Sequence, residues 1–378
     1  MVKLLKHRSI SKFECYTFAQ KNESMSLSAA KENRSVATWL LIGVGMTIIQ
    51  IALGGITRLT GSGLSITEWD VITGALPPLN EAAWLAEFDK YKQTPQFQLL
   101  NFDFQLSDFK FIFFWEWFHR LWARLIGLVF AFGFVWFIVK KSFKKEMIGS
   151  LLVLFFLGAL QGLVGWIMVA SGLTGDAVYV KPTRLALHFI LALGLLSYTY
   201  WFALSLLVPK DQIIADKKIR NTNLFLIGLL VVQLIYGALM AGHKAANAAA
   251  TWPTINGSWI PDTLFTHQPF LLNFIDNTIL IHFIHRGLAY LILALLIYWS
   301  LQLFKLSLTT TLRKAAKFPL LLVIVQVVLG IASVLTSSNI VPGSWGGFEW
   351  MAQLHQLTGM LLLLSLVSIL FLVRPKIC

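Results

Sequence analysis

The sequence predicts an all-α integral membrane protein that crosses the bilayer with eight helices. Hydrophobic residues make up 57% of its 378 residues, charged residues only 13%, and the mean hydropathy is +0.70. An ordinary soluble domain carries about 25% charged residues. A membrane-spanning helix needs about 20 mostly apolar residues. Eight such runs occur, at 36–56, 112–139, 149–170, 185–207, 222–242, 279–303, 317–336 and 352–373.

The basic residues predict the orientation of these spans. The chain has 31 basic and 18 acidic residues, a net charge of +13. Twenty-one of the basic residues fall in the two termini and in the three short loops on the same side, and seven fall on the other side. By the positive-inside rule both termini face the cytoplasm, as an even number of spans requires. The charge therefore indicates membrane orientation and not nucleic-acid binding.

The predicted organisation is two four-helix halves joined by a short loop. The divisions are a cytoplasmic tail at 1–35, a first half at 36–207, a cytoplasmic loop at 208–221 and a second half at 222–373. Two long outer loops, about 58–110 and 243–278, are rich in Trp, Pro, Asn and Gly, so we expect ordered caps.

The tail and the cysteines indicate the compartment and exclude several classes of site. The tail is basic, but it also carries Glu14, Glu23 and Glu32, whereas mitochondrial transit peptides are poor in acidic residues. A bacterial inner membrane is therefore favoured over a mitochondrial one. The only cysteines are Cys15 and Cys378, which excludes a disulfide scaffold, a thiolate metal cluster and a Cys-x-x-Cys-His haem attachment site.

Polar residues inside the spans reveal an internal repeat. Each odd-numbered span carries Gln-x-x-x-Gly, and each even-numbered span carries a histidine near its outer end. The glutamine–glycine pairs are Gln50/Gly54, Gln161/Gly165, Gln233/Gly237 and Gln326/Gly330, and the histidines are His119, His188, His285 and His355. Four spans per half place both halves in the same orientation, so the sequence predicts a parallel repeat of two pseudo-symmetric four-helix bundles.

The four histidines indicate haem ligation. Ionisable residues inside a bilayer usually mark function, although one histidine alone could simply bond to a neighbouring helix. A structural zinc needs four converging ligands, whereas the repeat keeps two histidines in each half. Two facing imidazoles in a four-helix bundle suit a haem iron. Nearby small residues leave room for a macrocycle or allow close helix packing, and both readings stay open. They are Ala123, Gly127, Ala192, Gly194, Gly287, Ala289 and Gly359.

Charged residues beside the histidines distinguish the halves. Arg120 and Arg286 each follow a histidine, where an arginine can bind haem propionates or reach the lipid headgroups. Glu116 and His282 occupy equivalent positions, each three residues before a histidine. A carboxylate beside a haem edge can act as a base, nucleophile or electrostatic stabiliser, or it can merely pair with Arg120 or Arg124. The asymmetry predicts chemistry in the first half.

From about residue 40 to residue 373 the sequence resembles the haem A synthase family. The resemblance rests on several motifs and is strongest in the first. These are Gly54-Gly-Ile-Thr-Arg-Leu-Thr-Gly-Ser-Gly-Leu-Ser65, Pro77-Pro78-Leu79, Tyr91-Lys92, Glu116-Trp-Phe-His119-Arg120, Arg184-Leu-Ala-Leu-His188, Thr251-Trp-Pro253, His285-Arg286 and His355-Gln356. The chain resembles the type without a cysteine pair in the outer loops, so a disulfide there is not implied.

The resemblance implies a reaction and a set of roles. The family oxidises the C8 methyl group of haem O to a formyl group, which yields haem A for terminal oxidases. His285 and His355 match the pair that binds a haem B cofactor, and His119 and His188 match the pair at the substrate site. Glu116 matches the glutamate regarded as catalytic. Haem O synthase and an electron donor are the implied partners besides membrane lipid, and homo-oligomers remain open.

Two other functions fit part of the pattern. A di-haem b-type electron carrier would also use bis-histidine haems, but it would place them on opposite sides of the membrane. All four histidines here lie at the outer level, which weakens that alternative. A transporter would need discontinuous helices at the midplane, and no span has a central proline to suggest one.

Overall fold

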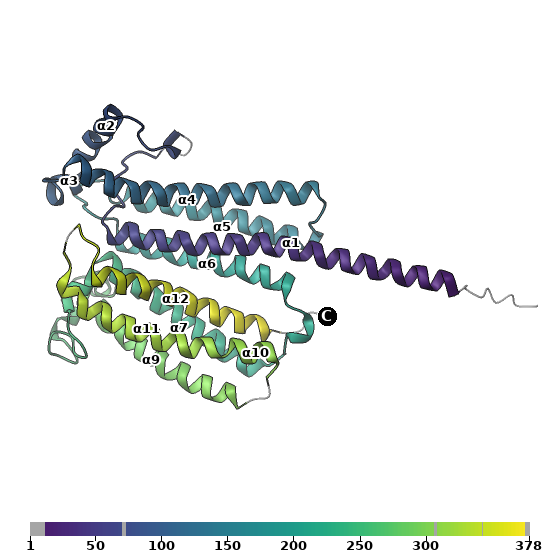
Figure 1. Cartoon of the computed structure of the whole chain (residues 1–378). Coiled ribbons are helices and arrows are strands. Elements are labelled where there is room, and N and C mark those ends of the chain that lie inside the picture. The colour runs from purple at the N-terminus through teal and green to yellow at the C-terminus, as the bar shows by residue number, and fades with distance from the viewer. Residues whose placement is uncertain (1–11, 70–72, 306–307, 342, 375–378) are drawn as a thin grey trace, which may run out of the picture.

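The structure, a computed structural model, describes residues 12–69, 73–305, 308–341 and 343–374. Throughout this described part the chain forms helices and no strand (Figure 1). Eight helical segments are long and apolar enough to cross a membrane, which confirms the predicted class. The principal spanning helices are α1 (Lys12–Leu59), α4 (Leu106–Val139), α5 (Lys145–Ala170), α6 (Pro182–Leu207), α7 (Lys217–Gly242), α9 (Thr278–Phe304), α11 (Lys317–Thr336) and α12 (Gly347–Leu372).

Helix α1 extends well beyond its predicted span. Its apolar segment begins at Asn33, but the helix itself begins at Lys12, inside the predicted 1–35 tail. Residues 12–32 contain neither Pro nor Gly, the two residues that most disfavour a helix, so the backbone hydrogen bonding continues. This part of α1 projects past the ends of the other helices (Figure 1). Residues 1–11 of the predicted tail and Lys376 lie outside the described residues.

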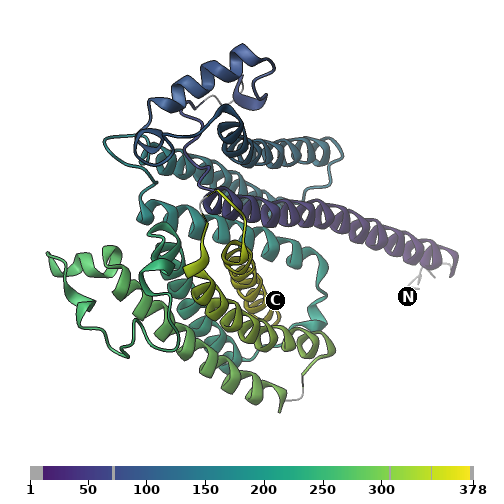
Figure 2. The same cartoon turned by 60° about the vertical axis from the view of Figure 1, so that its left-hand side comes forward.

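The spanning helices pack as two groups of four. In the first group α1 contacts α4 and α6, and α5 packs on α6. In the second group α7 contacts α9 and α12, and α11 also contacts α9 and α12. The groups meet where α6 lies against α7 and α12, and where α1 lies against α12 (Figure 2). Helix α1 therefore belongs to the first group and also touches the second.

The first outer loop is an ordered cap, as predicted. It contains α2 (Glu81–Lys92) and α3 (Pro95–Leu100), at the end of the bundle away from the described termini (Figure 1). Tyr91 stacks on Phe109 of α4 with ring centroids 5.3 Å apart. Burial raises the pKa of Tyr91 to about 12, and its hydroxyl donates to Gln96. The loop is thus anchored on α4 by a buried aromatic cluster.

The second outer loop is ordered by short helices and by asparagine side chains. Its helices are η3 (Ala245–Ala249), η4 (Asp262–Phe265), η5 (Phe270–Leu272) and α8 (Asn273–Asp276). The Asn277 amide donates to the carbonyls of Thr263 and Leu264, and its Oδ1 caps α9. His243 donates from Nε2 to the Ile275 carbonyl at 2.7 Å, so this histidine holds two parts of the loop together.

Candidate functional site

The four histidines lie near the same end of the bundle. Each of the four histidines occupies the first half of its helix, and the two long outer loops precede the helices of His119 and His285. The histidines are His119, His188, His285 and His355. The ring centroids of His285 and His355 are 6.3 Å apart, with the ring planes at 76°. The structure therefore brings His285 and His355 of the second half close together.

The geometry of the second pair fits a shared metal. A histidine nitrogen binds a metal at about 2.0–2.1 Å, so two rings on opposite sides of one ion would have centroids about 6 Å apart. The observed 6.3 Å for His285 and His355 matches this separation. No group of three or more His, Cys, Asp or Glu side chains converges anywhere in the described residues. The donor set thus fits axial ligation of a haem iron and does not fit a tetrahedral zinc site.

Each repeated glutamine lies against the histidine of the following span. The Gln50 amide nitrogen is 3.1 Å from Nε2 of His119 and donates to its backbone carbonyl at 3.1 Å. Gln161 makes the same pair of contacts with His188, at 3.3 Å and 3.2 Å. In the second half the amide-to-Nε2 distances are 3.4 Å for Gln233–His285 and 3.3 Å for Gln326–His355. The glutamines were visible in the sequence, but their histidine contacts were not predicted.

The repeated glycines make room for the same four rings. A Cβ atom on Gly165 would lie 2.8 Å from Cε1 of His188, and one on Gly330 would lie 2.9 Å from Cε1 of His355. The corresponding distance is 3.2 Å for both Gly54–His119 and Gly237–His285. The glutamine of the Gln-x-x-x-Gly motif therefore places a side-chain amide next to each histidine, and the glycine leaves space for the imidazole ring.

The other small residues divide between the two roles that the sequence left open. A Cβ atom on Gly127, Gly194 or Gly287 would meet nothing within 4 Å, so these glycines do not serve close helix packing. Gly359 is different, because a Cβ atom there would lie 3.2 Å from the Gln326 amide nitrogen and 3.4 Å from Leu234. Open space beside the first three glycines agrees with room for a ligand or lipid, whereas Gly359 serves packing.

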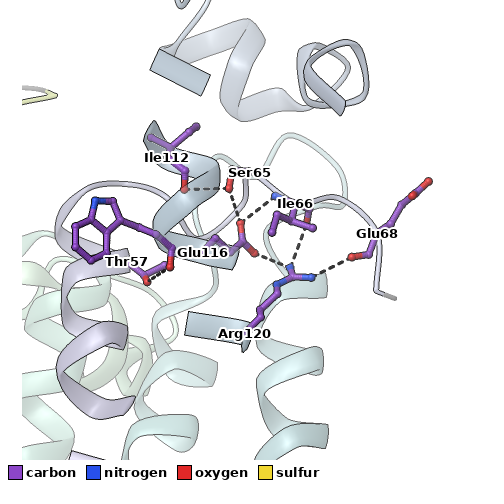
Figure 3. Close-up of polar contacts among 8 residues, drawn as sticks. Thr57, Ser65, Ile66, Glu68, Ile112, Glu116 and Arg120 are labelled. Atoms are coloured by element: carbon purple, nitrogen blue, oxygen red, sulfur yellow. Dashed lines mark hydrogen bonds and ion pairs between the residues drawn. The ribbon is translucent and has the colours of Figure 1, made fainter. Parts of the chain in front are cut away.

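Glu116 is held by three hydrogen-bond donors (Figure 3). Its Oε2 accepts from the Ser65 hydroxyl at 2.8 Å and from the Ile66 amide at 2.9 Å. Its Oε1 accepts from Arg120 at 2.5 Å, so the salt bridge considered from the sequence is present. Glu116 is only 3% exposed. The three donors satisfy both carboxylate oxygens and so compensate for their removal from water.

Arg120 also anchors the first outer loop. It donates to the carbonyls of Ile66 at 3.1 Å and Glu68 at 3.0 Å (Figure 3). Its guanidinium also lies over the Trp69 ring, 5.0 Å from the centroid. The loop, Arg120 and Glu116 thus form one connected polar unit above His119.

Arg286 and His282 anchor the second loop in the corresponding way. Arg286 donates to the carbonyls of Ala249 at 2.9 Å and Thr254 at 3.2 Å. His282 donates from Nε2 to the Ala245 carbonyl at 2.7 Å. The Nε of Arg286 is buried and has no hydrogen-bond partner among the described residues. His282 therefore contacts the loop backbone, as Arg286 does.

A polar seam between the halves was missed in the sequence. From α12, Gln353 donates to the Ala52 carbonyl and Gln356 donates to the Ile51 carbonyl, both at 3.0 Å. Gln356 follows His355, and Ile51 follows Gln50, so the seam joins the segments that carry both sites. Gly55 permits the approach, since a Cβ atom there would meet both glutamine amides. The only sequence signal was the second glycine of Gly54-Gly55.

We expect Gly55→Ala to weaken the contact between the halves. The new methyl group displaces the amides of Gln353 and Gln356 and breaks two interhelical hydrogen bonds, each worth about 1 kcal/mol. Thermal unfolding in detergent should therefore begin at a lower temperature than in the wild type. Gly45→Ala is the matched control on the same helix, because a Cβ atom there meets nothing within 4 Å. Equal unfolding temperatures for Gly55→Ala and Gly45→Ala would contradict the role of the seam.

Comparison with known proteins identifies the family of the chain. The family model described as COX15-CtaA, cytochrome oxidase assembly protein, matches residues 37–367. A heme A synthase of Flavobacterium johnsoniae is 41% identical over 311 residues, 81% of this chain and 91% of that protein. Heme A synthases of Rhodospirillum centenum and Paracoccus denitrificans are 43% and 42% identical, covering 82% and 80% of this chain and 82% and 81% of their own lengths. This eight-span chain, with its paired histidines, belongs to the COX15-CtaA family of cytochrome oxidase assembly proteins.

Proposed function

We propose that this protein is a haem A synthase, a membrane oxidoreductase that converts haem O to haem A. The observation that carries the proposal is the asymmetry between two similar sites. Each half holds a histidine pair backed by glutamines, but only the first has a buried carboxylate, Glu116, one helical turn from a histidine. The similarity to heme A synthases along most of the chain supports the same reaction.

The second half is proposed to hold a resident haem B. His285 and His355 would be the residues that hold its iron, since their separation fits a shared metal. The unpartnered Nε of Arg286 would bind a propionate while its other nitrogens stay on the loop carbonyls. When bound, the haem B supplies one-electron redox chemistry. The chain's contribution is to hold the two ligand side chains in place.

The first half is proposed to bind the substrate haem O between His119 and His188. With water as the oxygen source, conversion of a methyl to a formyl group releases four electrons and four protons, and an external electron acceptor would have to take up the electrons. Glu116 would lie near the reacting methyl group, where its negative charge stabilises developing positive charge or its oxygen accepts a proton. Arg120 would hold Glu116 through its bond to Oε1. Because Arg120 also bonds to two loop carbonyls, it has less capacity than Arg286 to bind a haem propionate.

The cellular setting is likewise proposed. The acidic residues of the basic tail favour a bacterial inner membrane over a mitochondrial one. The excess of basic residues on one side favours both termini in the cytoplasm. The substrate would come from a haem O synthase, and an electron carrier would serve the haem B. A homo-oligomer is compatible with the long lipid-facing helices.

Haem analysis of cells tests the proposal. The chain is expressed with a haem O synthase in a host that lacks haem A, and extracted haems are separated by chromatography. Haem A or its hydroxymethyl precursor should appear only when both proteins are present. A di-haem electron carrier would instead retain haem without any modified product, and that outcome would overturn the proposed function. The position of all four histidines at one end of the bundle already favours the enzyme over a carrier that spans the membrane.

A further inference from the structure

The segment that follows α1 turns back sharply toward α4. Gly61 adopts a left-handed conformation with φ of +69°, its amide donates to Arg58, and the Ser62 amide donates to Thr57. This pair of bonds is the Schellman arrangement that ends many helices. The Ser65 amide then donates to the Ser62 carbonyl at 3.2 Å. The helix ending therefore delivers the Ser65 side chain to the face of α4 that carries Glu116.

Ser65 meets Glu116 in a site without water access. Ser65 is 1% exposed and Glu116 is 3% exposed, and the hydroxyl donates to Oε2 at 2.8 Å (Figure 3). The Ile66 amide donates to the same oxygen. Hydrogen bonds to a charged group are stronger in such low-dielectric surroundings than in water. Two donors on Oε2 and Arg120 on Oε1 fix both the position and the rotation of the carboxylate.

The second half lacks this device among its described residues. At the position equivalent to Glu116, His282 donates to a loop carbonyl, that of Ala245. Arg286 likewise meets only carbonyls of that loop. The first half, which carries Glu116, thus has the Ser65 hydroxyl in its outer loop. In the second half His282 and Arg286 bond instead to backbone carbonyls of the loop.

We infer that Ser65 is a positioning residue for Glu116, an assignment that rests on the proposed function. With the hydroxyl in place, Oε2 is held between Ser65 and Ile66 while Oε1 pairs with Arg120. Without it, the carboxylate can rotate about its bond to Arg120 and lose its orientation toward the substrate. Ser65 does not touch the substrate and acts only through Glu116.

The test compares three variants of the full-length chain supplied with haem O. Ser65→Ala removes the hydroxyl, Ser65→Thr keeps one, and Ser62→Ala is the matched control. Ser62 is 0% exposed in the same turn, but its hydroxyl bonds to Thr60 and not to Glu116. Turnover is measured from haem A and its hydroxymethyl precursor, haem O binding by absorbance titration, and integrity by retained haem and thermal unfolding.

Ser65→Ala should lower turnover about tenfold to a hundredfold, as expected for a misaligned reacting group. Haem O affinity should change by less than about twofold, because the lost interaction acts on turnover and not on binding. Ser65→Thr should recover part of the turnover, and Ser62→Ala should resemble the wild type. Wild-type turnover in Ser65→Ala, equal losses in Ser62→Ala, or a loss confined to haem O binding would each overturn the inference. An inactive wild type would instead overturn the proposed function, together with the inference that rests on it.

Discussion

Glu116→Gln should reduce haem A formation by roughly 10²–10⁴-fold, the range expected when a group that transfers protons or stabilises charge is lost. Glutamine keeps the size of the side chain, and its oxygen can still accept from Ser65 and Ile66. It loses the negative charge, and its amide group faces Arg120 as a second donor. Haem O binding should persist, since the proposed ligands His119 and His188 are unchanged. Chromatography of extracted haems together with absorbance titration measures both quantities.

Glu349→Gln provides a matched control for this variant. Glu349 is a buried carboxylate, 4% exposed, at the start of α12 in the other half, where it accepts from the Gly346 amide. It therefore matches Glu116 in charge and burial, but it lies outside the proposed substrate site. Haem A formation at the wild-type rate in Glu116→Gln would show that its carboxylate has no catalytic role. Equal losses in the two variants would point to the general cost of removing a buried charge.

Gly165→Ala and Gly330→Ala should each impair one haem site and spare the other. The new methyl group would lie 2.8 Å from the His188 ring or 2.9 Å from the His355 ring, so each ring must move. Overpacking of this kind costs about 1–3 kcal/mol, which corresponds to roughly a tenfold to hundredfold loss of ligand affinity. We expect Gly165→Ala to weaken haem O binding and Gly330→Ala to lower the haem retained on purification. Absorbance spectra of the purified proteins distinguish the two effects.

The control for the glycine variants lies on the same helix as Gly165. A Cβ atom on Gly162 would meet nothing within 4 Å, so Gly162→Ala adds a methyl group to α5 without touching a histidine. Its haem content should match the wild type. Loss of the same haem in Gly165→Ala and Gly330→Ala would contradict the assignment of separate substrate and cofactor sites to the two halves.

Local composition predicted the spans because a bilayer imposes a simple requirement on each helix. Every run of about 20 apolar residues became a helix, since lipid offers no partner for unpaired backbone groups. The extent of α1 was the exception. The first part of α1 is polar, so hydropathy does not identify it as a helix. The helix continues there because no residue interrupts the backbone hydrogen bonds.

The candidate site was predictable in its residues and not in its contacts. His119 and Gln50 could be recognised because each recurs at the equivalent position of the second half. Glu116 could be recognised because the equivalent position there is His282. The bonds from Ser65 and Ile66 to Glu116 join segments about 50 residues apart, and no local pattern records them. Arg120 and Arg286 could likewise be recognised from the sequence as charged residues beside histidines. Their hydrogen bonds to the loop carbonyls could not be predicted.

The sequence by itself determined the membrane class, the eight spans and the paired histidines, because hydropathy and internal repetition are properties of the chain order. Only the tertiary structure decided that Glu116 is held by the first outer loop and that Gln353 and Gln356 of α12 bond to α1. These contacts depend on how the chain turns after α1 and on how closely α1 and α12 approach each other. Both arise when distant segments pack together to satisfy polar groups that are buried away from water.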